Sequence, residues 1–223
     1  MTRTIVITGG IGSGKSEVCR QLALRGYTNQ YDADSRVKAL YSLVPELVPS
    51  IEKSLGMNLR GEDGRFVPEL LAGRIFSDRE ALLRVESIVF PVLMEDFNSF
   101  CSGLDTASGE EQVVLFESAT VLEKTFFNNL FDSVILVSAP FRLRLERACR
   151  RDASTQEKIL SRMNNQKLIN FLSDSESGCW GVSEETVEQV RKRISAVIDS
   201  DCSLEELGIR AEKAVKYTLT KML

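Results

Sequence analysis

One stretch decides the fold: Thr4-Ile5-Val6-Ile7-Thr8-Gly9-Gly10-Ile11-Gly12-Ser13-Gly14-Lys15-Ser16. Its second half fits the pattern G-x-x-x-x-G-K-[ST], with an apolar strand before it and a helical pattern from Glu17 to about Arg25 after it. The glycines let the backbone wrap around an anion, and the positive end of the following helix dipole adds attraction. Lys15 can reach β- and γ-phosphate oxygens, and the Ser16 hydroxyl can ligate a bridging Mg²⁺. The stretch therefore predicts a nucleoside triphosphate site rather than a dinucleotide site.

Composition and charge limit the classes of protein that this chain can be. Its 223 residues are 43% hydrophobic, which fits one α/β domain with an insertion. The net charge is −4, from 28 basic and 32 acidic residues without a long basic run, so we expect no nucleic-acid partner. The chain enters a strand directly after Met1-Thr2-Arg3, with no apolar leader and no apolar run of membrane-spanning length. We expect a cytoplasmic protein with no membrane partner, and a monomer or weak oligomer.

Cysteine and histidine usage narrows the chemistry further. The five cysteines are scattered without C-x-x-C spacing, so a disulfide framework or a zinc site is not expected. The sequence contains no histidine, which excludes histidine as a general base or as a metal ligand. Any proton acceptor must then be a carboxylate, a lysine, a cysteine or a tyrosine.

Apolar runs and helical patterns alternate along the chain, which predicts an α/β fold with a parallel sheet covered by helices on both faces. Strands are expected at 4–8, 29–31, 113–116, 133–138 and 196–198. Helices are expected at 17–25, 35–55 with a bend near two prolines, 70–76, 80–100, 142–151, 154–171, 182–193 and 204–222. The segments 56–66 and 102–111 read as loops, and 173–181 as a polar, mobile stretch.

Two carboxylates follow the second predicted strand, in Asp32-Ala33-Asp34. Ligands of open α/β sheets bind outside the carboxyl ends of the strands, so both side chains could face that crevice. One could accept a proton from an attacking hydroxyl while the other holds a Mg²⁺ water or the sugar of the acceptor. Helix capping by Asp34 is the alternative, and the spacing alone leaves both possibilities open.

Charged side chains elsewhere could complete a phosphoryl-transfer site. Arg144, Arg147 and Arg151 share one helical face and could neutralise charge on a moving phosphoryl group, although a solvated basic helix has the same pattern. Glu117 ends an apolar strand, where an acid could hold Mg²⁺ through water or align the acceptor. An exposed turn glutamate is the other reading of Glu117 and of Glu123.

These residues together resemble the dephospho-CoA kinases, the P-loop enzymes of the last step of coenzyme A synthesis. The resemblance covers nearly the whole chain, and its most specific part is T-G-G-I-G-S-G-K-S at 8–16 followed by D-A-D at 32–34. Less specific matches are 64–78 leading into V-E-S-I-V-F-P at 85–91, Glu117 through Glu123, R-A-C-R-R-D at 147–152, Gln166, and V-I-D at 197–199 followed by L-E-E-L at 204–207.

The resemblance implies a P-loop kinase fold, with a five-stranded parallel sheet like that of nucleoside monophosphate kinases. The nucleotide-binding core would comprise 1–44, 101–146 and 167–223, with a helical acceptor-binding insertion at 45–100 and a lid at 147–166. ATP, with Mg²⁺, would donate its γ-phosphate to the ribose 3′-hydroxyl of dephospho-CoA. The small-molecule partners would therefore be ATP and dephospho-CoA.

The resemblance also assigns roles to individual residues. Lys15, Asp34 and Arg147 are the expected catalytic residues, with Asp34 as the base and Arg147 as the transition-state arginine, and Ser16 is the expected metal ligand. The resemblance implies that ATP is bound by Gly10, Ile11, Gly12, Ser13, Gly14, Lys15, Ser16, Glu17 and Arg151. It implies that the acceptor is bound by Asp32, Asp34, Glu117 and Phe90. We further expect Arg147 to lie away from the phosphates without a ligand and to move in with the lid.

Several positions depart from the family pattern, chiefly at the acceptor end. Phe90 stands where a histidine is usual and Pro68 where an arginine is usual. Other departures are Glu17 for a hydroxyl residue, Ala119 for a proline, and Ser200 and Cys202 for asparagine and glycine. Two alternatives therefore stay open: a related kinase with a different nucleoside-like or small hydroxylated acceptor, and a P-loop switch that binds nucleotide without catalysis.

Overall fold

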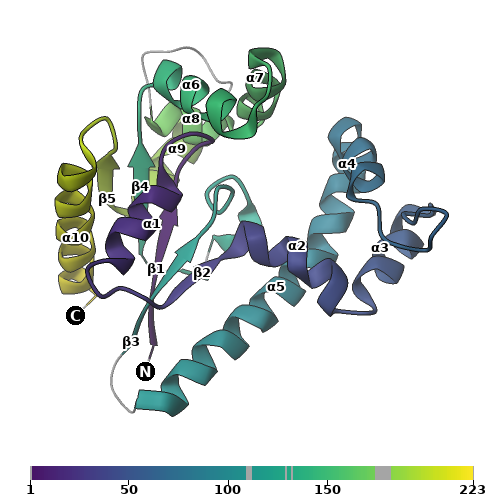
Figure 1. Cartoon of the computed structure of the whole chain (residues 1–223), viewed down its shortest axis with the longest axis horizontal. Helices are drawn as coiled ribbons and strands as arrows, with labels where there is room; N and C mark the ends of the chain where they lie inside the picture. The colour runs from purple at the N-terminus through teal and green to yellow at the C-terminus, as the bar shows by residue number, and fades with distance from the viewer. Residues whose placement is uncertain (1, 109–111, 129, 132, 174–181, 223) are drawn as a thin grey trace. The chain divides into compact units, whose positions relative to one another are not determined.

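A computed structural model describes the chain except residues 1, 109–111, 129, 132, 174–181 and 223 (Figure 1). It divides into two compact units, unit 1 with Met1–Asp32 and Ser108–Leu223, and unit 2 with Ala33–Ala107. The insertion expected at 45–100 lies inside unit 2, which begins earlier in the chain and ends later.

A five-stranded parallel sheet forms the centre of unit 1, in the order β2-β3-β1-β4-β5. The strands are β1 (Thr2–Thr8), β2 (Gln30–Asp32), β3 (Gln112–Glu117), β4 (Val134–Ser138) and β5 (Ile194–Asp199). β1 is central and pairs with β3 from Thr2↔Gln112 to Ile7↔Glu117. This arrangement confirms the expected α/β fold and its parallel sheet.

Both faces of the sheet are buried, which explains why its strands are continuous apolar runs rather than alternating patterns. On one face, α1 (Lys15–Ala23) and α10 (Leu204–Lys221) pack side by side (Figure 1). Their apolar residues form one core with the side chains Ile5, Ile7, Leu115, Ile135, Val137 and Ile198. The alternate side chains Val6, Val114, Phe116, Val134 and Leu136 are also at most 1% exposed. The sheet is therefore a rigid base for the loops at the carboxyl ends of its strands.

The remaining elements of unit 1 follow β3 and β4. They are a 3₁₀ turn (Thr125–Phe127), α6 (Phe141–Asp152), α7 (Gln156–Asn164), α8 (Lys167–Ser173) and α9 (Glu184–Arg191). The single helix expected over 154–171 is thus two helices, α7 and α8, because the backbone turns at Asn165 and Gln166. The stretch expected to be mobile lies, from residue 174, outside the described residues.

Unit 2 is helical, with α2 (Ala33–Leu43), α3 (Leu47–Leu55), α4 (Pro68–Ser77) and α5 (Arg79–Ser108). The helix expected over 35–55 is two helices, since Pro45 has no N–H group to continue α2. The loop 56–66 contains an isolated bridge between Arg60 and Phe66, and the Phe66 ring stacks on Tyr41 with centroids 4.7 Å apart. Arg36 on α2 makes a two-pronged ion pair with Asp96 on α5, with both N–O distances at 2.6 Å.

The polar stretch 102–111 was expected to be a loop, and over 102–108 this expectation is wrong, because α5 continues to Ser108; residues 109–111 lie outside the described part of the chain. Within α5, serine hydroxyl groups bond to the backbone of their own helix, as such residues can in place of loop contacts. Ser99 and Ser102 donate to the carbonyl oxygens of Glu95 and Asn98, each at 2.9 Å.

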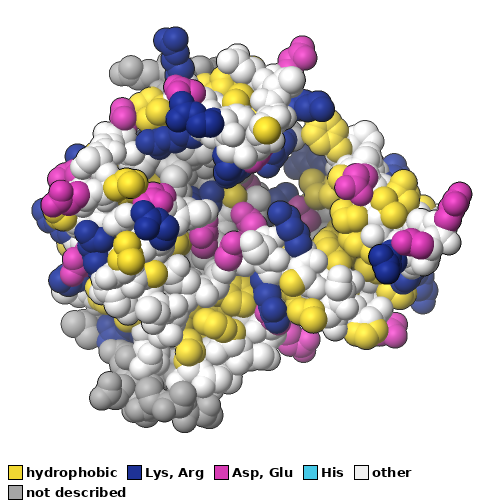
Figure 2. All heavy atoms as spheres, viewed as in Figure 1, with side chains coloured by type: hydrophobic (Ala, Val, Ile, Leu, Met, Phe, Trp, Pro, Cys, Tyr) yellow, Lys and Arg dark blue, Asp and Glu magenta, His cyan; other side chains and the backbone are white. Residues whose placement is uncertain are grey.

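The surface carries charges of both signs, as the nearly balanced numbers of acidic and basic residues predict. Acidic and basic side chains are interspersed over the face seen in Figure 2. Among the residues that the structure describes, no helix is both long and apolar enough to cross a membrane.

Candidate functional site

The glycine-rich loop lies between the end of β1 at Thr8 and the start of α1 at Lys15. Gly12 and Gly14 have φ angles of +75° and +91°, in the left-handed region that favours glycine. A side chain on Gly12 would also collide with the backbone carbonyl of Arg144. The first backbone N–H groups of α1 follow the loop directly, which is the arrangement that binds phosphate at a helix N-terminus.

Side chains from the segment α6 to α8 contact the glycine-rich loop and bond to its backbone. The side-chain oxygen Oε1 of Gln166 accepts the Ile11 N–H at 2.8 Å. Arg144 is fully buried next to Gly10, and its Nη2 donates to Oδ1 of Asn170 at 2.8 Å. Asn170 in turn donates from Nδ2 to the Met163 carbonyl at 2.8 Å. Arg144 is therefore a buried structural residue behind the loop, not part of a phosphate-facing set as its helical spacing indicated.

A cavity of about 250 Å³ opens on the other side of the loop. It is lined by Gly12, Gly14, Lys15, Ser16, Glu17, Arg147 and Arg151. The structure thus brings together the expected lysine, the serine and two of the three arginines. A cavity with these three cations and a helix N-terminus favours an anion with several negative charges.

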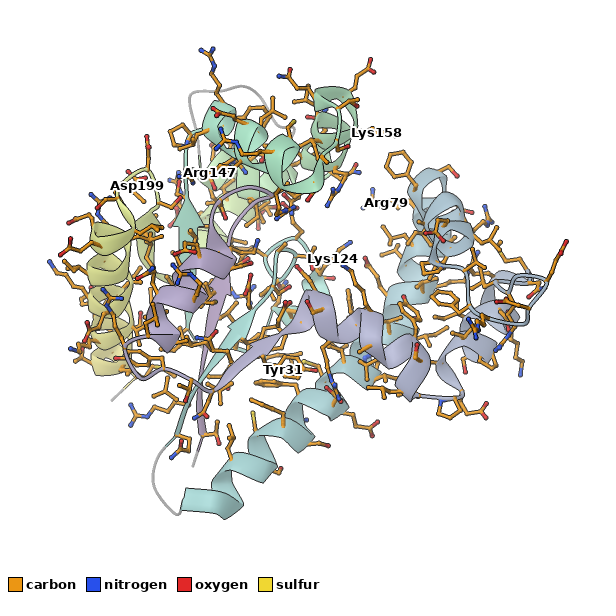
Figure 3. The ribbon with its side chains drawn as sticks, in the orientation of Figure 1. Tyr31, Arg79, Lys124, Arg147, Lys158 and Asp199 are labelled. Carbon is orange, nitrogen blue, oxygen red and sulfur yellow. The ribbon has the colours of Figure 1, made fainter. Side chains whose placement is uncertain are left out.

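Arg147, which is labelled in Figure 3, lines this cavity and is bonded to the loop that follows β5. Its Nη1 donates to the Ser200 hydroxyl at 2.9 Å and its Nη2 to the Ser200 carbonyl at 3.0 Å. Here the guanidinium of Arg147 lies beside the phosphate loop, and its expected movement with the lid stays a prediction. The helix α6 carries it toward the loop, because Ala148 on α6 packs in an apolar cluster with Ile159 and Met163, against which Ile11 of the loop rests.

Arg151 is oriented by a neighbouring acid. Its Nε donates to Oδ1 of Asp152 at 2.7 Å, and Arg162 of α7 donates to Oδ2 of the same carboxylate at 2.7 Å. The hydrogen bond from Arg151, followed by that from Arg162, lowers the pKa of Asp152 to about 2. Asp152 thus stays ionised near neutral pH and links the ends of α6 and α7.

Acidic residues lie at the carboxyl ends of β2 and β3. Glu117 is in register with Ile7 of β1 and with Asp32 of β2. The Ser16 hydroxyl donates to Oε1 of Glu117 at 2.7 Å, so the last residue of the motif is joined to the strand-end acid. Burial, then the charge of Glu117, raises the pKa of the Cys19 thiol, which stays protonated. The expected exposed-turn alternative for Glu117 does not hold, because Glu117 is half-buried and bonded to the loop helix.

Two other acids of unit 1 have local roles. Glu17 lines the cavity but accepts two hydrogen bonds from Arg20, at 2.9 and 2.6 Å, and these lower the pKa of its carboxyl. Glu123 is half-buried rather than an exposed turn residue, and its Oε1 accepts the Ile169 N–H at 2.9 Å in the first turn of α8. Burial raises the pKa of Glu123, while hydrogen bonds from the α8 backbone oppose that shift.

Two of the expected acceptor residues belong to unit 2. Asp34 is exposed in the first turn of α2, where a carboxylate interacts favourably with the helix dipole. Because α2 begins at Ala33, Asp34 is inside the helix and is not the N-cap residue that the capping alternative required. Phe90 is half-buried on α5, and Pro68 is the first residue of α4, where proline is well tolerated.

Sequence reasoning missed the roles of two residues: Asn170, which accepts a hydrogen bond from Arg144, and Ser200, which accepts one from Arg147. Each acts through a contact between segments that are far apart in the sequence, so no local pattern marks them. Ser200 was noted only as a departure from a family pattern.

The described residues contain no group of three or more acidic, cysteine or histidine side chains that could hold a metal ion by themselves. The pair formed by Ser16 and Glu117 is the place where such a cation would find protein oxygens.

Comparison with known proteins shows what this chain is similar to. The sequence model of the dephospho-CoA kinase family matches residues 3–170. A dephospho-CoA kinase of Porphyromonas gingivalis is 40% identical over 164 residues, covering 74% of this chain and 77% of the relative. One of Chlorobaculum tepidum is 29% identical over 218 residues, covering 96% and 94%. A crystal structure of a Thermus thermophilus protein, 29% identical, superposes with a TM-score of 0.72 over 96% of each chain.

Proposed function

Because the chain belongs to the dephospho-CoA kinase family, we propose that it transfers the γ-phosphoryl group of ATP to the ribose 3′-hydroxyl of dephospho-CoA. This reaction yields coenzyme A and is the final step of its biosynthesis. The observation that carries the proposal is the cavity at the glycine-rich loop, where Lys15, Arg147 and Arg151 converge. Phosphoryl transfer spreads negative charge over the moving group, and fixed cations stabilise it without reorganising during the reaction.

We assign the triphosphate to the loop Gly10 to Ser16. Lys15 would contact the β- and γ-phosphates, and Arg147 and Arg151 would approach from α6, the first helix of the proposed lid at 147–166. Glu17 lines the same cavity, but its carboxylate is neutralised by Arg20, so it adds little repulsion toward phosphate.

The pair formed by Ser16 and Glu117 fits a magnesium ion. The Ser16 hydroxyl donates its hydrogen bond to Glu117, which leaves the lone pairs of the Ser16 oxygen available to a cation. Mg²⁺ is usually bound by one or two protein oxygens together with substrate phosphates and waters, which suits a site without a cage of carboxylates. When bound, the ion would supply positive charge against the negative charge of the phosphates. Ser16 would hold it and Glu117 would orient Ser16.

The acceptor end of the proposal rests on unit 2 and on the strand-end acids. We propose that Asp34 aims the acceptor hydroxyl and accepts its proton, since the chain has no histidine to do so. Asp32, Glu117 and Phe90 are the other proposed acceptor contacts, and the helical insertion at 45–100 is the proposed acceptor-binding region. The exposure of Asp32 and Asp34 leaves both carboxylates accessible to a substrate.

One observation favours a second possible acceptor, a different nucleoside-like or small hydroxylated molecule. Phe90 and Pro68 depart from the family pattern, and both lie in unit 2, the proposed acceptor region. A related kinase with another nucleoside-like or small hydroxylated acceptor would keep the same ATP site. The proposed setting for either reaction is the cytoplasm, with a monomer or weak oligomer as the active form.

An acceptor panel tests the proposal directly. ATP consumption is followed by a coupled assay with dephospho-CoA, nucleosides and shikimate, each with and without Mg²⁺. We expect turnover with dephospho-CoA only, and only with Mg²⁺. Turnover with another acceptor alone would support the second kinase reading. Nucleotide binding without acceptor-dependent turnover would support the switch.

A further inference from the structure

Ser200 occupies a buried point between β5, the phosphate loop and α6. It follows Asp199, the last residue of β5, and only 2% of it is exposed. Its backbone N–H continues the sheet pairing by donating to the Ser138 carbonyl at 2.9 Å. The backbone of Ser200 is therefore fixed by the rigid sheet rather than by the loop that follows.

The hydroxyl of Ser200 joins the two sides of the phosphate cavity. It donates its only proton to the carbonyl oxygen of Ser13 in the loop, at 2.6 Å. Its lone pairs then face Arg147, whose Nη1 donates to it at 2.9 Å. A second bond runs from Nη2 of Arg147 to the Ser200 carbonyl at 3.0 Å. One residue thus clamps the guanidinium at two points and ties it to the loop backbone.

We propose that Ser200 is a positioning residue that sets the orientation of Arg147 for phosphoryl transfer. A guanidinium is planar and rigid, so two bonds from its two terminal nitrogens fix its plane as well as its position. The remaining N–H groups of Arg147 are then directed by Ser200 and can donate to phosphate oxygens. Nη1 also lies 3.8 Å from the point where a side chain on Gly14 would begin, which places the clamped group beside the loop.

The position of the two hydrogen bonds between Ser200 and Arg147 predicts which kinetic step depends on them. Ser200 touches the loop through the Ser13 carbonyl, and a carbonyl oxygen that loses one donor costs less than an N–H group that loses its acceptor, so we expect the N–H groups of the loop to keep their places. Removing the hydroxyl leaves Arg147 with the single bond to the Ser200 carbonyl, about which the guanidinium can swing. An arginine that neutralises charge developing on the moving phosphoryl group then loses orientation mainly in the transition state.

The test is a double-mutant cycle that joins Ser200→Ala and Arg147→Ala. For Ser200→Ala we expect kcat to fall about 10- to 100-fold, the size expected for a hydrogen bond to a charged group, with KM for ATP changed by less than about 3-fold. Ser200→Thr, which keeps the hydroxyl, should recover most of the lost kcat. In the Arg147→Ala background, Ser200→Ala should cost less than about 2-fold more, because the group that it orients is gone.

Controls separate positioning from folding. Asp201→Asn changes the exposed neighbour in the same loop and should leave kcat near the parent value. Melting temperatures of all variants report on stability. If Ser200→Ala does not fold, Ser200→Thr and Ser200→Cys test the positioning role instead. The thiol of Ser200→Cys is a weaker acceptor and should lower kcat, whereas the hydroxyl of Ser200→Thr should keep kcat near the parent value.

The inference rests on the proposed kinase function, so one measurement is independent of the acceptor. Isothermal titration with ADP plus Mg²⁺ and aluminium fluoride, a mimic of the transferring phosphoryl group, should show about 10-fold weaker binding to Ser200→Ala, with ADP affinity unchanged. A parent protein without turnover on dephospho-CoA would refute the proposed function but leave this readout intact. Additive losses in the cycle, a raised KM for ATP at constant kcat, or unchanged affinity for the mimic would overturn the positioning role.

Discussion

Gln166 gives the sharpest prediction about the phosphate loop, because one side-chain oxygen holds the backbone of a loop residue. Its Oε1 accepts the Ile11 N–H at 2.8 Å, and Gln166 is only 7% exposed. Gln166→Met keeps the volume of the side chain, so no cavity is made, and it removes the acceptor together with the longer hydrogen bond from Nε2 to the Ala119 carbonyl at 3.4 Å. An unsatisfied buried N–H costs about 1–3 kcal/mol, and the half-buried Ile11 favours the lower part of that range, about 1–2 kcal/mol.

Two measurable effects follow from that free energy. The melting temperature should fall by about 2–8 °C, at about 2–4 °C per kcal/mol for a chain of this size. The ATP dissociation constant should rise by about 5- to 30-fold, since ATP must now order the loop on binding. kcat at saturating ATP should stay within a few fold of the parent, because bound ATP restores the loop.

Thermal melts and isothermal titration with ATP measure both quantities on the same samples. Gln166→Glu keeps an acceptor oxygen and should bind ATP more tightly than Gln166→Met. Gln189→Met, on the exposed surface of α9, is the matched control and should leave both quantities unchanged. A Gln166→Met protein that melts and binds ATP like the parent would show that the loop does not depend on this bond.

The remaining predictions concern the cations and carboxylates of the proposed reaction. Lys15→Ala should abolish measurable transfer while the melting temperature stays near the parent value, and turnover within a few fold of the parent would contradict this. Arg147→Ala should lower kcat more than it raises KM for ATP in steady-state kinetics, and the reverse pattern would reassign it to ground-state binding. Asp34→Asn should cut kcat by about 10²–10⁴ with ATP affinity nearly unchanged, and Asp32→Asn should have a smaller effect. Loss of ATP affinity in Asp34→Asn, with normal single-turnover transfer, would make Asp34 a metal ligand or a structural residue.

The parts of the fold that local patterns determine could be predicted from the sequence. The strand–loop–helix unit at the start of the chain is contained in one continuous motif, and the apolar runs at 113–116 and 133–138 mark buried strands. The order of the strands in the sheet was not predicted, because pairing depends on contacts between segments distant in the sequence. The end of α5 was misplaced, because a polar stretch that contains Ser and Gly is typical of a loop, and composition does not reveal that Ser102 bonds to its own helix.

The candidate site shows the same division between local and distant contacts. Lys15 and Ser16 could be identified because their neighbours in the sequence build the phosphate loop. Arg144 and Arg147 share a helical face, and helical spacing could not distinguish them. Packing does: Arg144 is buried against Asn170 and Gly10, whereas Arg147 reaches the cavity through Ser200. The role of Ser200 depends on a contact with Ser13, far away in the sequence.

The central claim is that this chain phosphorylates dephospho-CoA at the expense of ATP. The most direct measurement is a single reaction with the purified protein, ATP, Mg²⁺ and dephospho-CoA, in which ADP and coenzyme A are quantified together by chromatography and mass spectrometry. The account predicts equal amounts of both products, with neither formed when Lys15→Ala replaces the parent protein. ADP formed without coenzyme A, or coenzyme A formed equally well by Lys15→Ala, would contradict it.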